Sequence, residues 1–283
     1  MPTIAYELCD VFTDRPLAGN ALAVFTDAGG LDGATMQALA RETNLSESAF
    51  VLPASDPGAD AAIRIFTPTM ELPFAGHPTL GTAFVLAARR ARDVITLETG
   101  RGVVTVKLTR ESGRPAFGWM TQPLPRIEPY RATAALLAGL GVAGSNVPVD
   151  LYDNGPHYVY VGLDAPEQVA ALAPDMSLLA ALGSTAFSVF APKGSTWKCR
   201  VFAPGEGIAE DPATGAAAGP LAVHLARHGR IAFGDEIVIE QGAEIKRPSV
   251  LHARARGDGD RLESVEVGGY AVIVGQGTFT LAG

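Results

Sequence analysis

The sequence predicts two similar domains, each built from strands around one long helix, and three observations lead to this fold class. The chain has 283 residues, about two domains at roughly 150 residues each. Hydrophobic residues make up 47% and charged residues 18%, a globular composition. Residues 64–68 (RIFTP) are echoed by 200–204 (RVFAP), and a Pro- and Gly-marked segment follows each copy, at 77–83 and 211–217. Because repeats fix architecture, we expect a pseudo-symmetric pair with a site between its halves, lined by both copies.

The first domain is expected to be rich in strands. Met36, Leu39 and Ala40 have the spacing of one helix face, which predicts a helix over 32–43. A long helix is expected over 77–92, because its middle is apolar and its arginines suit a helix C-terminus. Alternating or apolar runs predict strands at 4–12, 22–25, 49–52, 61–66, 94–97, 103–108 and 116–120.

The second domain is expected to repeat this pattern after a linker. Two prolines within residues 122–125 indicate the boundary, so the predicted domains are 1–122 and 126–270. Helices are expected over 131–140 and 212–228, the latter capped by Gly229. Strands are expected at 149–152, 158–161, 186–191, 197–202, 236–240, 250–255 and 264–269. A last strand, at 271–283, is expected to return to the first domain.

Composition excludes several classes of function. The net charge of -8 argues against nucleic acid and anionic membranes as partners. No apolar run reaches the ~20 residues of a membrane span, and no secretory signal is visible. Cys9 and Cys199 lie in apolar runs, as expected of reduced thiols, so a cytoplasmic location is the default. The five histidines are scattered without ligand spacing, so no metal site is expected.

Two predicted helix starts are the first candidate binding sites. Gly76 and His77 stand at one, and Gly215 and Ala216 follow Asp211 at the other. Free backbone N–H groups and the helix dipole make such ends suited to anions, and two of them would hold a carboxylate and stabilise enolate-like charge. The alternative is structural: Asp211 before a proline is a common N-cap, and His77 can be a hydrogen-bonded core histidine.

Three further side chains are candidates from turns and loops. Glu47 precedes an apolar strand, where burial would suit a carboxyl to carry a proton; the alternative is a solvated loop glutamate. Asn154 and Asn20 lie in turns just before strands, and each either presents its amide to a ligand or only shapes its turn.

The motifs together resemble the phenazine-biosynthesis PhzF-like family. The resemblance rests on residues 10–13, 19–24, 44–47, 66–68, 73–78 and 210–215, in order over nearly the whole chain. It implies an α+β fold of the diaminopimelate-epimerase type, with two pseudo-symmetric domains. Each domain would be a β-barrel-like sheet around a central helix, with the site in the cleft between them.

The resemblance also implies a cofactor-independent isomerase acting on a small carboxylate-bearing substrate, and a homodimer. Glu47 is the implied acid/base, His77 and Asp211 the implied supporting catalytic residues, and the implied substrate-binding residues are Asn20, Gly76, Gly215, Ala216 and Asn154. Related racemases use a cysteine on each half, and neither Cys9 nor Cys199 lies in either motif. This favours a mechanism in which one base transfers the proton over a mechanism that uses two bases. Many members have serine where this chain has Ala216, which is compatible with a different substrate or with a non-catalytic metabolite-binding protein. The other alternative is an epimerase or racemase, with Asp211 as a second base.

Overall fold

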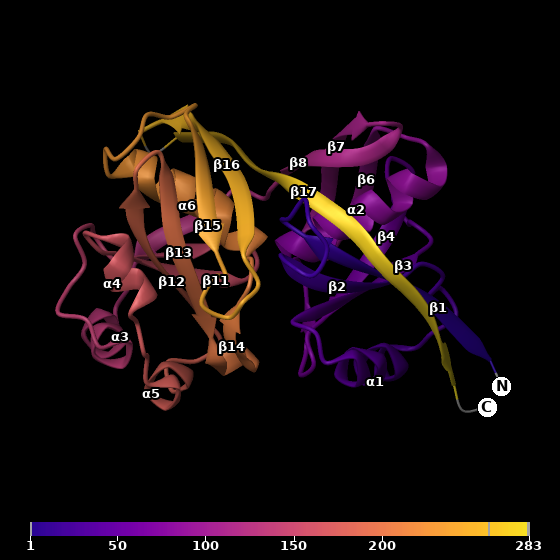
Figure 1. Ribbon diagram of the computed structural model, residues 1–283, viewed down its shortest axis with the longest axis horizontal. Coiled ribbons are helices and arrows are strands. Elements are labelled where there is room, and N and C mark those ends of the chain that lie inside the picture. The colour runs from indigo at the N-terminus through magenta and orange to yellow at the C-terminus, as the bar shows by residue number, and fades with distance from the viewer. Residues whose placement is uncertain (1, 260, 282–283) are drawn as a thin grey trace. The chain divides into compact units, whose positions relative to one another are not determined.

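The computed structural model describes residues 2–259 and 261–281, which form two compact units (Figure 1). Unit 1 contains residues 2–121 and 268–281, and unit 2 contains residues 122–259 and 261–267. The long strand β17 (Arg261–Thr280) contributes residues to both units. The last two residues of the strand expected at 271–283 lie outside the described residues.

Eight strands of unit 1 form a closed ring. Each strand pairs with the next, and β8 pairs with β17, which pairs in turn with β1. Two of the pairings, β2 with β3 and β4 with β6, are parallel. The other strands of the ring are β1 (Thr3–Val11), β2 (Asn20–Phe25), β3 (Glu47–Leu52), β4 (Ala61–Phe66), β6 (Val94–Thr99), β7 (Gly102–Glu111) and β8 (Arg114–Thr121), and the short β5 (Glu71–Leu72) pairs with β4.

Helix α2 (Gly76–Arg90) is the central helix of unit 1. Every residue from Gly76 to Ala87 is buried, as expected of a helix that strands surround on all sides. A Cβ at Gly81 would lie 2.7 Å from side-chain atoms of Leu22 and Val11. A glycine here therefore lets the helix approach the strands closely.

Helix α1 (Gly33–Thr43) covers the outside of the sheet in unit 1. Its N-cap Asp32 accepts a hydrogen bond from the Thr35 N–H at 2.8 Å, which satisfies one of the open donors of the first turn. Met36, Leu39 and Ala40 are buried, as the helical spacing predicts. They join a hydrophobic cluster with stacked Phe25 and Phe50 rings 4.6 Å apart.

Unit 2 repeats the strand pairing of unit 1. The parallel pairs here are β11 with β12 and β13 with β15, and antiparallel pairs lie between and beside them. Its strands are β9 (Arg126–Pro129), β10 (Asp150–Asp153), β11 (His157–Gly162), β12 (Ala186–Lys193), β13 (Thr196–Ala203), β14 (Ile208–Asp211), β15 (Glu236–Gln241) and β16 (Ser249–Asp258). The repeat in the sequence thus corresponds to a repeat in sheet topology.

Helix α6 (Gly215–Arg227) is the central helix of unit 2 and is buried from Gly215 to Leu225. It begins at Gly215, so the predicted start at residue 212 is wrong by three residues. The predicted helix over 131–140 is α3 (Thr133–Leu140). The short α4 (Pro166–Ala170), α5 (Met176–Ala180) and the 3₁₀ turn η1 (Pro204–Glu206) are not predicted, because each is too short to show a helical period.

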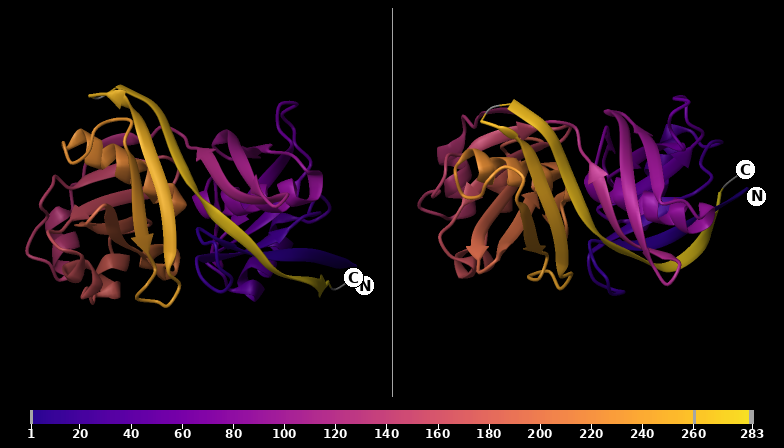
Figure 2. Two further views of the ribbon diagram at one scale, coloured as in Figure 1. Left: turned by 45° about the horizontal axis from the view of Figure 1, so that its top comes forward. Right: turned by 90° about the horizontal axis from the view of Figure 1, so that it is seen from above.

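Strand β17 corrects a second expectation, because the sequence predicts two strands where the chain forms one. The predicted break falls at Tyr270, directly after Gly268 and Gly269, and all three residues lie inside the strand. A Cβ on Gly268 would lie 2.8 Å from the Trp119 ring, and a Cβ on Gly269 would lie 2.4 Å from the Phe12 ring. The two glycines therefore let the strand pass close to aromatic side chains, and they do not form a turn. Figure 2 shows the strand as one long band.

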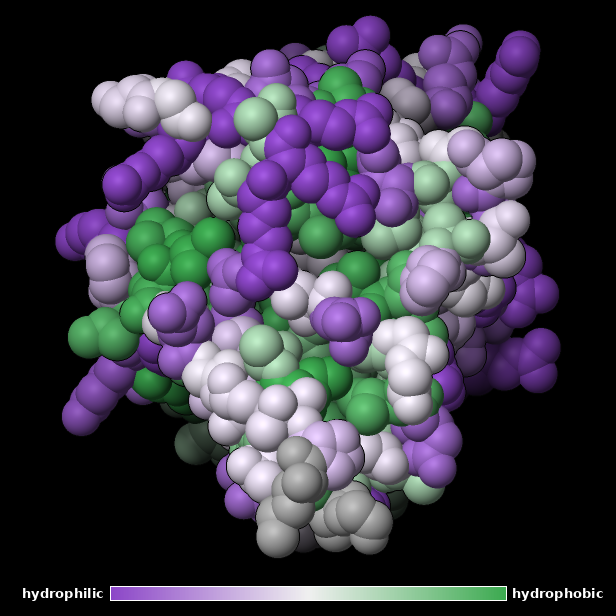
Figure 3. All heavy atoms as spheres, turned by 90° about the vertical axis from the view of Figure 1, so that its right-hand side faces the viewer, coloured by the Kyte–Doolittle hydropathy of each residue, from purple (hydrophilic) through white to green (hydrophobic). Residues whose placement is uncertain are grey.

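The exposed face of unit 1 shown in Figure 3 mixes hydrophilic side chains with smaller hydrophobic areas. Exposed large hydrophobic residues of unit 1 include Leu17, Met70 and Ile273. Among the described residues, no helix has both the length and the apolar character needed to cross a bilayer.

Candidate active site

Three predicted site residues of unit 1 come together although they are far apart in sequence. Glu47 is the first residue of β3, Asn20 the first residue of β2 and His77 the second residue of α2. Glu47 Oε2 lies 3.5 Å from His77 Nδ1, and Asn20 Nδ2 lies 3.3 Å from the same nitrogen. The Glu47 residue is only 7% exposed. It is therefore not the solvated loop glutamate of the alternative interpretation.

The hydrogen bonds of Asn20 indicate which tautomer the His77 ring adopts. Ser46 Oγ donates to Asn20 Oδ1 at 3.0 Å, which turns the amide NH₂ of Asn20 toward His77 Nδ1. Burial lowers the pKa of His77 to about 3, so the imidazole is neutral at pH 7. Its Nδ1 accepts and its Nε2 carries the proton; among the described residues, Nε2 has no hydrogen-bond partner. The Nδ1 lone pair thus lies beside the buried carboxyl group of Glu47, 3.5 Å from its Oε2.

The start of α2 adds backbone donors to this cluster. The N-cap is Ala75, and in the described structure no side chain caps the helix. Gly76 and His77 occupy the first turn, where N–H groups have no partner within a helix. Such donors and the helix dipole suit a carboxylate ligand.

A buried aspartate fixes the loop that leads to Asn20. Asp10 is 2% exposed and its Oδ2 accepts a hydrogen bond from the Leu17 N–H at 2.7 Å. Gly19 ends the loop with a φ of +66°, and a Cβ there would lie 2.3 Å from the Val11 carbonyl oxygen. Both features set the position of Asn20, and Gly19 must be glycine for that.

In unit 2, a glutamine holds the loop that carries Asp211. Asp211 is the last residue of β14, is buried, and accepts a hydrogen bond from Thr214 Oγ1 at 2.6 Å. Gln241 Nε2 donates to the Asp211 carbonyl at 2.7 Å, and Gln241 Oε1 accepts from the Thr214 N–H at 3.2 Å. Gln241 is not among the residues predicted from the sequence, because no local pattern relates β15 to this loop.

Proline inside α6 explains the role of Asn154. Pro220 has no N–H, so the Ala216 carbonyl four residues earlier loses its helical partner. Asn154 Nδ2 donates to this carbonyl at 2.9 Å. Tyr160 and Gln122 bond the neighbouring carbonyls of Ala217 and Gly215, at 2.7 and 2.8 Å. The amide of Asn154 thus holds the helix start; within the described structure its buried Oδ1 has no partner.

The structure changes the register of the repeat. The sequence repeat sets His77 against Asp211, yet His77 lies inside α2 and Asp211 lies four residues before α6. Matched by helix start, Gly76 corresponds to Gly215 and His77 to Ala216. The interpretation of Asp211 as an N-cap is therefore wrong, and the N-cap of α6 is Thr214.

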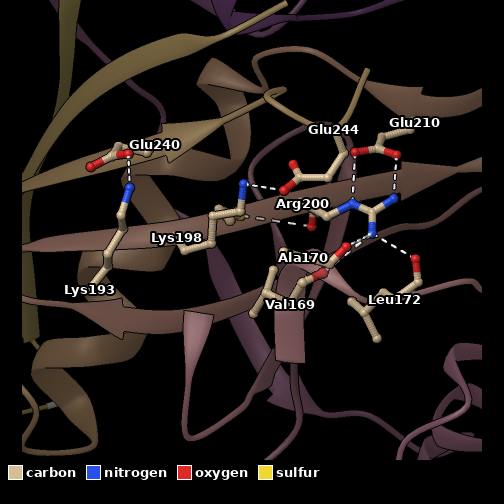
Figure 4. A network of polar contacts seen from close by, with 10 residues as sticks. Val169, Ala170, Leu172, Lys193, Lys198, Arg200, Glu210, Glu240 and Glu244 are labelled. Atoms are coloured by element: carbon tan, nitrogen blue, oxygen red, sulfur yellow. Dashed lines mark hydrogen bonds and ion pairs between the residues drawn. The ribbon is translucent and has the colours of Figure 1, made fainter. Parts of the chain in front are cut away.

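A bidentate ion pair lies beside Asp211. Arg200 on β13 donates to both carboxylate oxygens of Glu210, at 2.9 and 2.7 Å. Its third nitrogen donates to the carbonyls of Val169, Ala170 and Leu172 at the end of α4 (Figure 4). Both partners are buried, so the guanidinium connects β13, β14 and the α4 segment.

Neither cysteine is suited to act as a base. Cys9 and Cys199 are free and buried. Burial raises the pKa of Cys9 far above its usual range and that of Cys199 to about 12. A thiolate pair of the kind that two-base racemases use is therefore not available on this chain, whose two cysteines are both described.

Two of the histidines that were expected to lack the spacing of metal ligands come together with an aspartate. His224 and His228 lie four residues apart at the end of α6, so both face Asp150 on β10. One side-chain ligand atom from each of the three residues lies within 4.8 Å of the others. The expectation that histidines lack ligand spacing is wrong here, and the i, i+4 pattern could have revealed the pair.

Comparisons with known proteins show the family to which the chain belongs. The model of the phenazine biosynthesis-like protein family matches residues 9–277. A trans-2,3-dihydro-3-hydroxyanthranilate isomerase of Pseudomonas aeruginosa is 48% identical over 272 residues, covering 96% of this chain and 98% of that protein. The enzyme of the same name from Pseudomonas fluorescens is 48% identical over 276 residues, covering 98% of this chain and 99% of the relative.

Solved structures confirm the predicted α+β fold class. A Bacillus anthracis PhzF-family protein superposes with a TM-score of 0.84 at 25% identity, covering 99% of this chain and 100% of the other. A protein described as a predicted epimerase from Pseudomonas aeruginosa gives 0.83 at 32% identity, with the same coverage. A probable proline racemase from Agrobacterium radiobacter, 16% identical with a TM-score of 0.69, covers 99% of this chain and 93% of its own and shares the fold. The chain therefore belongs to the phenazine biosynthesis-like (PhzF) family, and it is an isomerase.

Proposed function

We propose that this isomerase moves a proton between two carbons of a small carboxylate-bearing metabolite, with Glu47 as the acid/base and without a cofactor. One observation carries the proposal: Glu47 is buried, and its Oε2 lies 3.5 Å from Nδ1 of a neutral histidine. A carboxyl in such a place can hold a proton between removal and return.

The proposed reaction needs one base. The carboxylate of Glu47 takes a proton from a C–H bond, and the electron pair of that bond passes into the conjugated system of the substrate. The carboxylic acid then returns the proton to another carbon, so substrate and product are isomers. His77 stays neutral and positions Glu47, and Asn20 holds the imidazole through Nδ1.

We propose that the helix start of each unit binds an anionic group. The amides of Gly76 in unit 1, and those of Gly215 and Ala216 in unit 2, are suited to a carboxylate and to the charge that develops during transfer. Asp211 would accept a hydrogen bond from a substrate hydroxyl or amino group. Asn154 would support the helix start through the Ala216 carbonyl and offer its Oδ1 as an acceptor.

For the substrate we propose trans-2,3-dihydro-3-hydroxyanthranilate or a close analogue. The support is 48% identity over nearly the full length to isomerases of that name. Ala216 is the reason to include analogues, because its methyl group offers no hydroxyl to the substrate. A binding site that lacks one hydrogen-bonding group has a different preference among substrates that differ by one polar group.

Glu47→Gln is the main test. We expect about a 10²–10⁴-fold loss of kcat, since amide nitrogen cannot shuttle the proton, with the fold retained by circular dichroism. The measurement is turnover of the proposed substrate and of analogues, followed by NMR in deuterated water. Glu42→Gln, an exposed glutamate on α1, is the matched control and should keep wild-type activity. A Glu47→Gln enzyme that incorporates label at the wild-type rate would refute the role of Glu47.

The same experiment separates the alternatives. Inversion of one stereocentre, with solvent label at that centre alone, would show an epimerase with a second base. Stabilisation by a metabolite without turnover, across the panel, would show a binding protein. The homodimer and the cytoplasmic location stay predictions; light scattering of the purified chain tests the first.

A further inference from the structure

The end of α6 carries a compact group of nitrogen and oxygen ligands away from the helix start. His228 Nε2 lies 3.0 Å from Asp150 Oδ2, and His224 Nδ1 lies 4.0 Å from the same oxygen. All three groups belong to unit 2, on α6 and β10. The proposed proton transfer uses none of them.

We propose that Asp150, His224 and His228 form a binding site for a divalent transition-metal cation such as Zn²⁺ or Co²⁺. Two imidazoles and one carboxylate are a ligand set that these ions accept, with positions left for water. Ligand atoms bound at about 2.1 Å lie about 3.0–3.5 Å apart at octahedral or tetrahedral angles. The spacings to the carboxylate oxygen are 3.0 and 4.0 Å, and all three ligand atoms lie within 4.8 Å of one another, so binding needs a closure of up to about 1–2 Å.

The hydrogen bonds at the cluster are compatible with coordination. Tyr152 Oη lies 3.1 Å from His224 Nδ1, and a phenol can donate there only when Nδ1 presents its lone pair. That neutral tautomer is the one that binds metal through Nδ1. Within the described part of the chain, His224 Nε2 is buried and has no hydrogen-bond partner, so no second-shell group holds the ring in place. This absence limits the affinity, and a cation at Nδ1 would take the place of the Tyr152 hydrogen bond.

Access and charge set the expected strength of binding. The side chains of His228 and Asp150 are 18% and 12% exposed, which gives an ion a route from solvent, while His224 is fully buried. The C-terminal end of a helix favours positive charge. The positive charge of Arg227 acts on both His224 and Tyr152 and opposes a cation. We therefore expect a dissociation constant on the order of 10 µM, and not the tighter binding of a closed structural site.

The position of the cluster assigns it a supporting role. His224 lies nine residues after Gly215, so it is about 14 Å along the helix from the start that we propose to bind substrate. A cation there would tie α6 to β10 and raise the stability of unit 2. It would leave the proton transfer unchanged, so its binding can be measured independently of activity.

Metal titration of the full-length chain tests the proposal. After treatment with a chelator, the protein is titrated with Zn²⁺ by calorimetry and with Co²⁺ by visible absorption. We expect one ion per chain and a Co²⁺ spectrum with ligand-field bands of nitrogen and oxygen coordination. His228→Gln and Asp150→Asn should each weaken binding at least tenfold, with circular dichroism confirming that the variants fold.

His252→Gln is the matched control. His252 Nδ1 lies 2.8 Å from Glu236 Oε1, a histidine–carboxylate pair outside the proposed three-ligand cluster, so its loss should leave the affinity unchanged. Absence of stoichiometric binding to the wild-type chain below about 1 mM would overturn the proposal. So would wild-type affinity in the His228→Gln protein. The wild-type Co²⁺ spectrum decides the question even if both ligand variants fail to fold.

Discussion

Each unit contains an arginine clamp, a bidentate arginine–glutamate ion pair beside a phenylalanine ring, and the two copies differ in burial. In unit 1, Arg64 bonds both oxygens of Glu71 at 2.7 Å and lies 5.1 Å from the Phe66 ring centroid. In unit 2, Arg200 bonds Glu210 in the same way and lies 4.9 Å from the Phe202 ring centroid. The side chains are 35% and 42% exposed in the first pair and 8% and 9% in the second.

A helix lies beside the arginine in both units, because a Cβ on Gly33 of α1 would lie 3.1 Å from Arg64 Nη2, and the difference lies in the backbone groups that contact the guanidinium. The carbonyls of Val169, Ala170 and Leu172, at the end of α4, accept hydrogen bonds from Arg200 (Figure 4), whereas the described hydrogen bonds of the Arg64 side chain go to Glu71. Glu210 directly precedes Asp211 in β14, so the buried clamp also fixes the strand that carries a proposed catalytic residue. A repeated sequence motif can therefore have different energetic weight in its two copies, depending on what covers it.

Replacement of each arginine should give the largest difference in the free energy of unfolding between the two units. Arg200→Met leaves the Glu210 charge buried and three carbonyls without their donor, so we expect a loss of about 3–5 kcal/mol in the free energy of unfolding. Arg64→Met removes a half-exposed pair and should cost about 1 kcal/mol or less. Urea denaturation of both variants measures the difference. Equal losses would show that burial by the α4 segment has no energetic effect.

The two helix starts should also differ in their effect on stability in acid, because a histidine stands at one and an alanine at the matching position of the other. The pKa of His77 in the folded state is about 3, whereas an unfolded histidine titrates near its ordinary value of about 6.5. The unfolded state therefore binds the proton first, and stability is lost as pH falls from about 6.5 toward 3. In unit 2 the corresponding residue is Ala216, which cannot titrate.

His77→Gln should accordingly remove up to about 1.4 kcal/mol per pH unit of acid sensitivity within that window. The measurement is the free energy of unfolding from pH 7 to pH 4 in the variant and in the wild type. His157→Gln, on an exposed side chain of β11, is the control and should leave the slope nearly unchanged. A wild-type slope in His77→Gln would contradict the neutral state of His77.

The local sequence pattern predicted most helices and strands of both units. It failed where residues distant in the sequence determine the structure. The strand at 61–66 and the buried face of α1 follow from spacing alone. The start of α6 at Gly215 depends on Gln241, which lies 27 residues beyond Thr214 and bonds its N–H. In the candidate site, Glu47 and His77 were separate candidates from a loop and a helix start. Only the family resemblance linked them, because no local signal shows that β3 and α2 meet. The repeat placed Arg200 opposite Arg64, but it showed neither the ion pair of Arg200 with Glu210 nor the burial of that pair.

The smallest expected effect concerns the central helices, since α6 contains an interior proline and α2 does not. Asn154 Nδ2 supplies the donor that Pro220 cannot give to the Ala216 carbonyl. Asn154→Ala should therefore cost about 1–2 kcal/mol in the wild-type background. In a Pro220→Ala background, the new N–H can reach the same carbonyl, so the cost of Asn154→Ala should fall. We expect a coupling energy of about 0.5–1 kcal/mol from a double-mutant cycle by urea denaturation. Additive costs would mean that Asn154 does not replace the missing helical bond and that its amide serves the helix start in some other way.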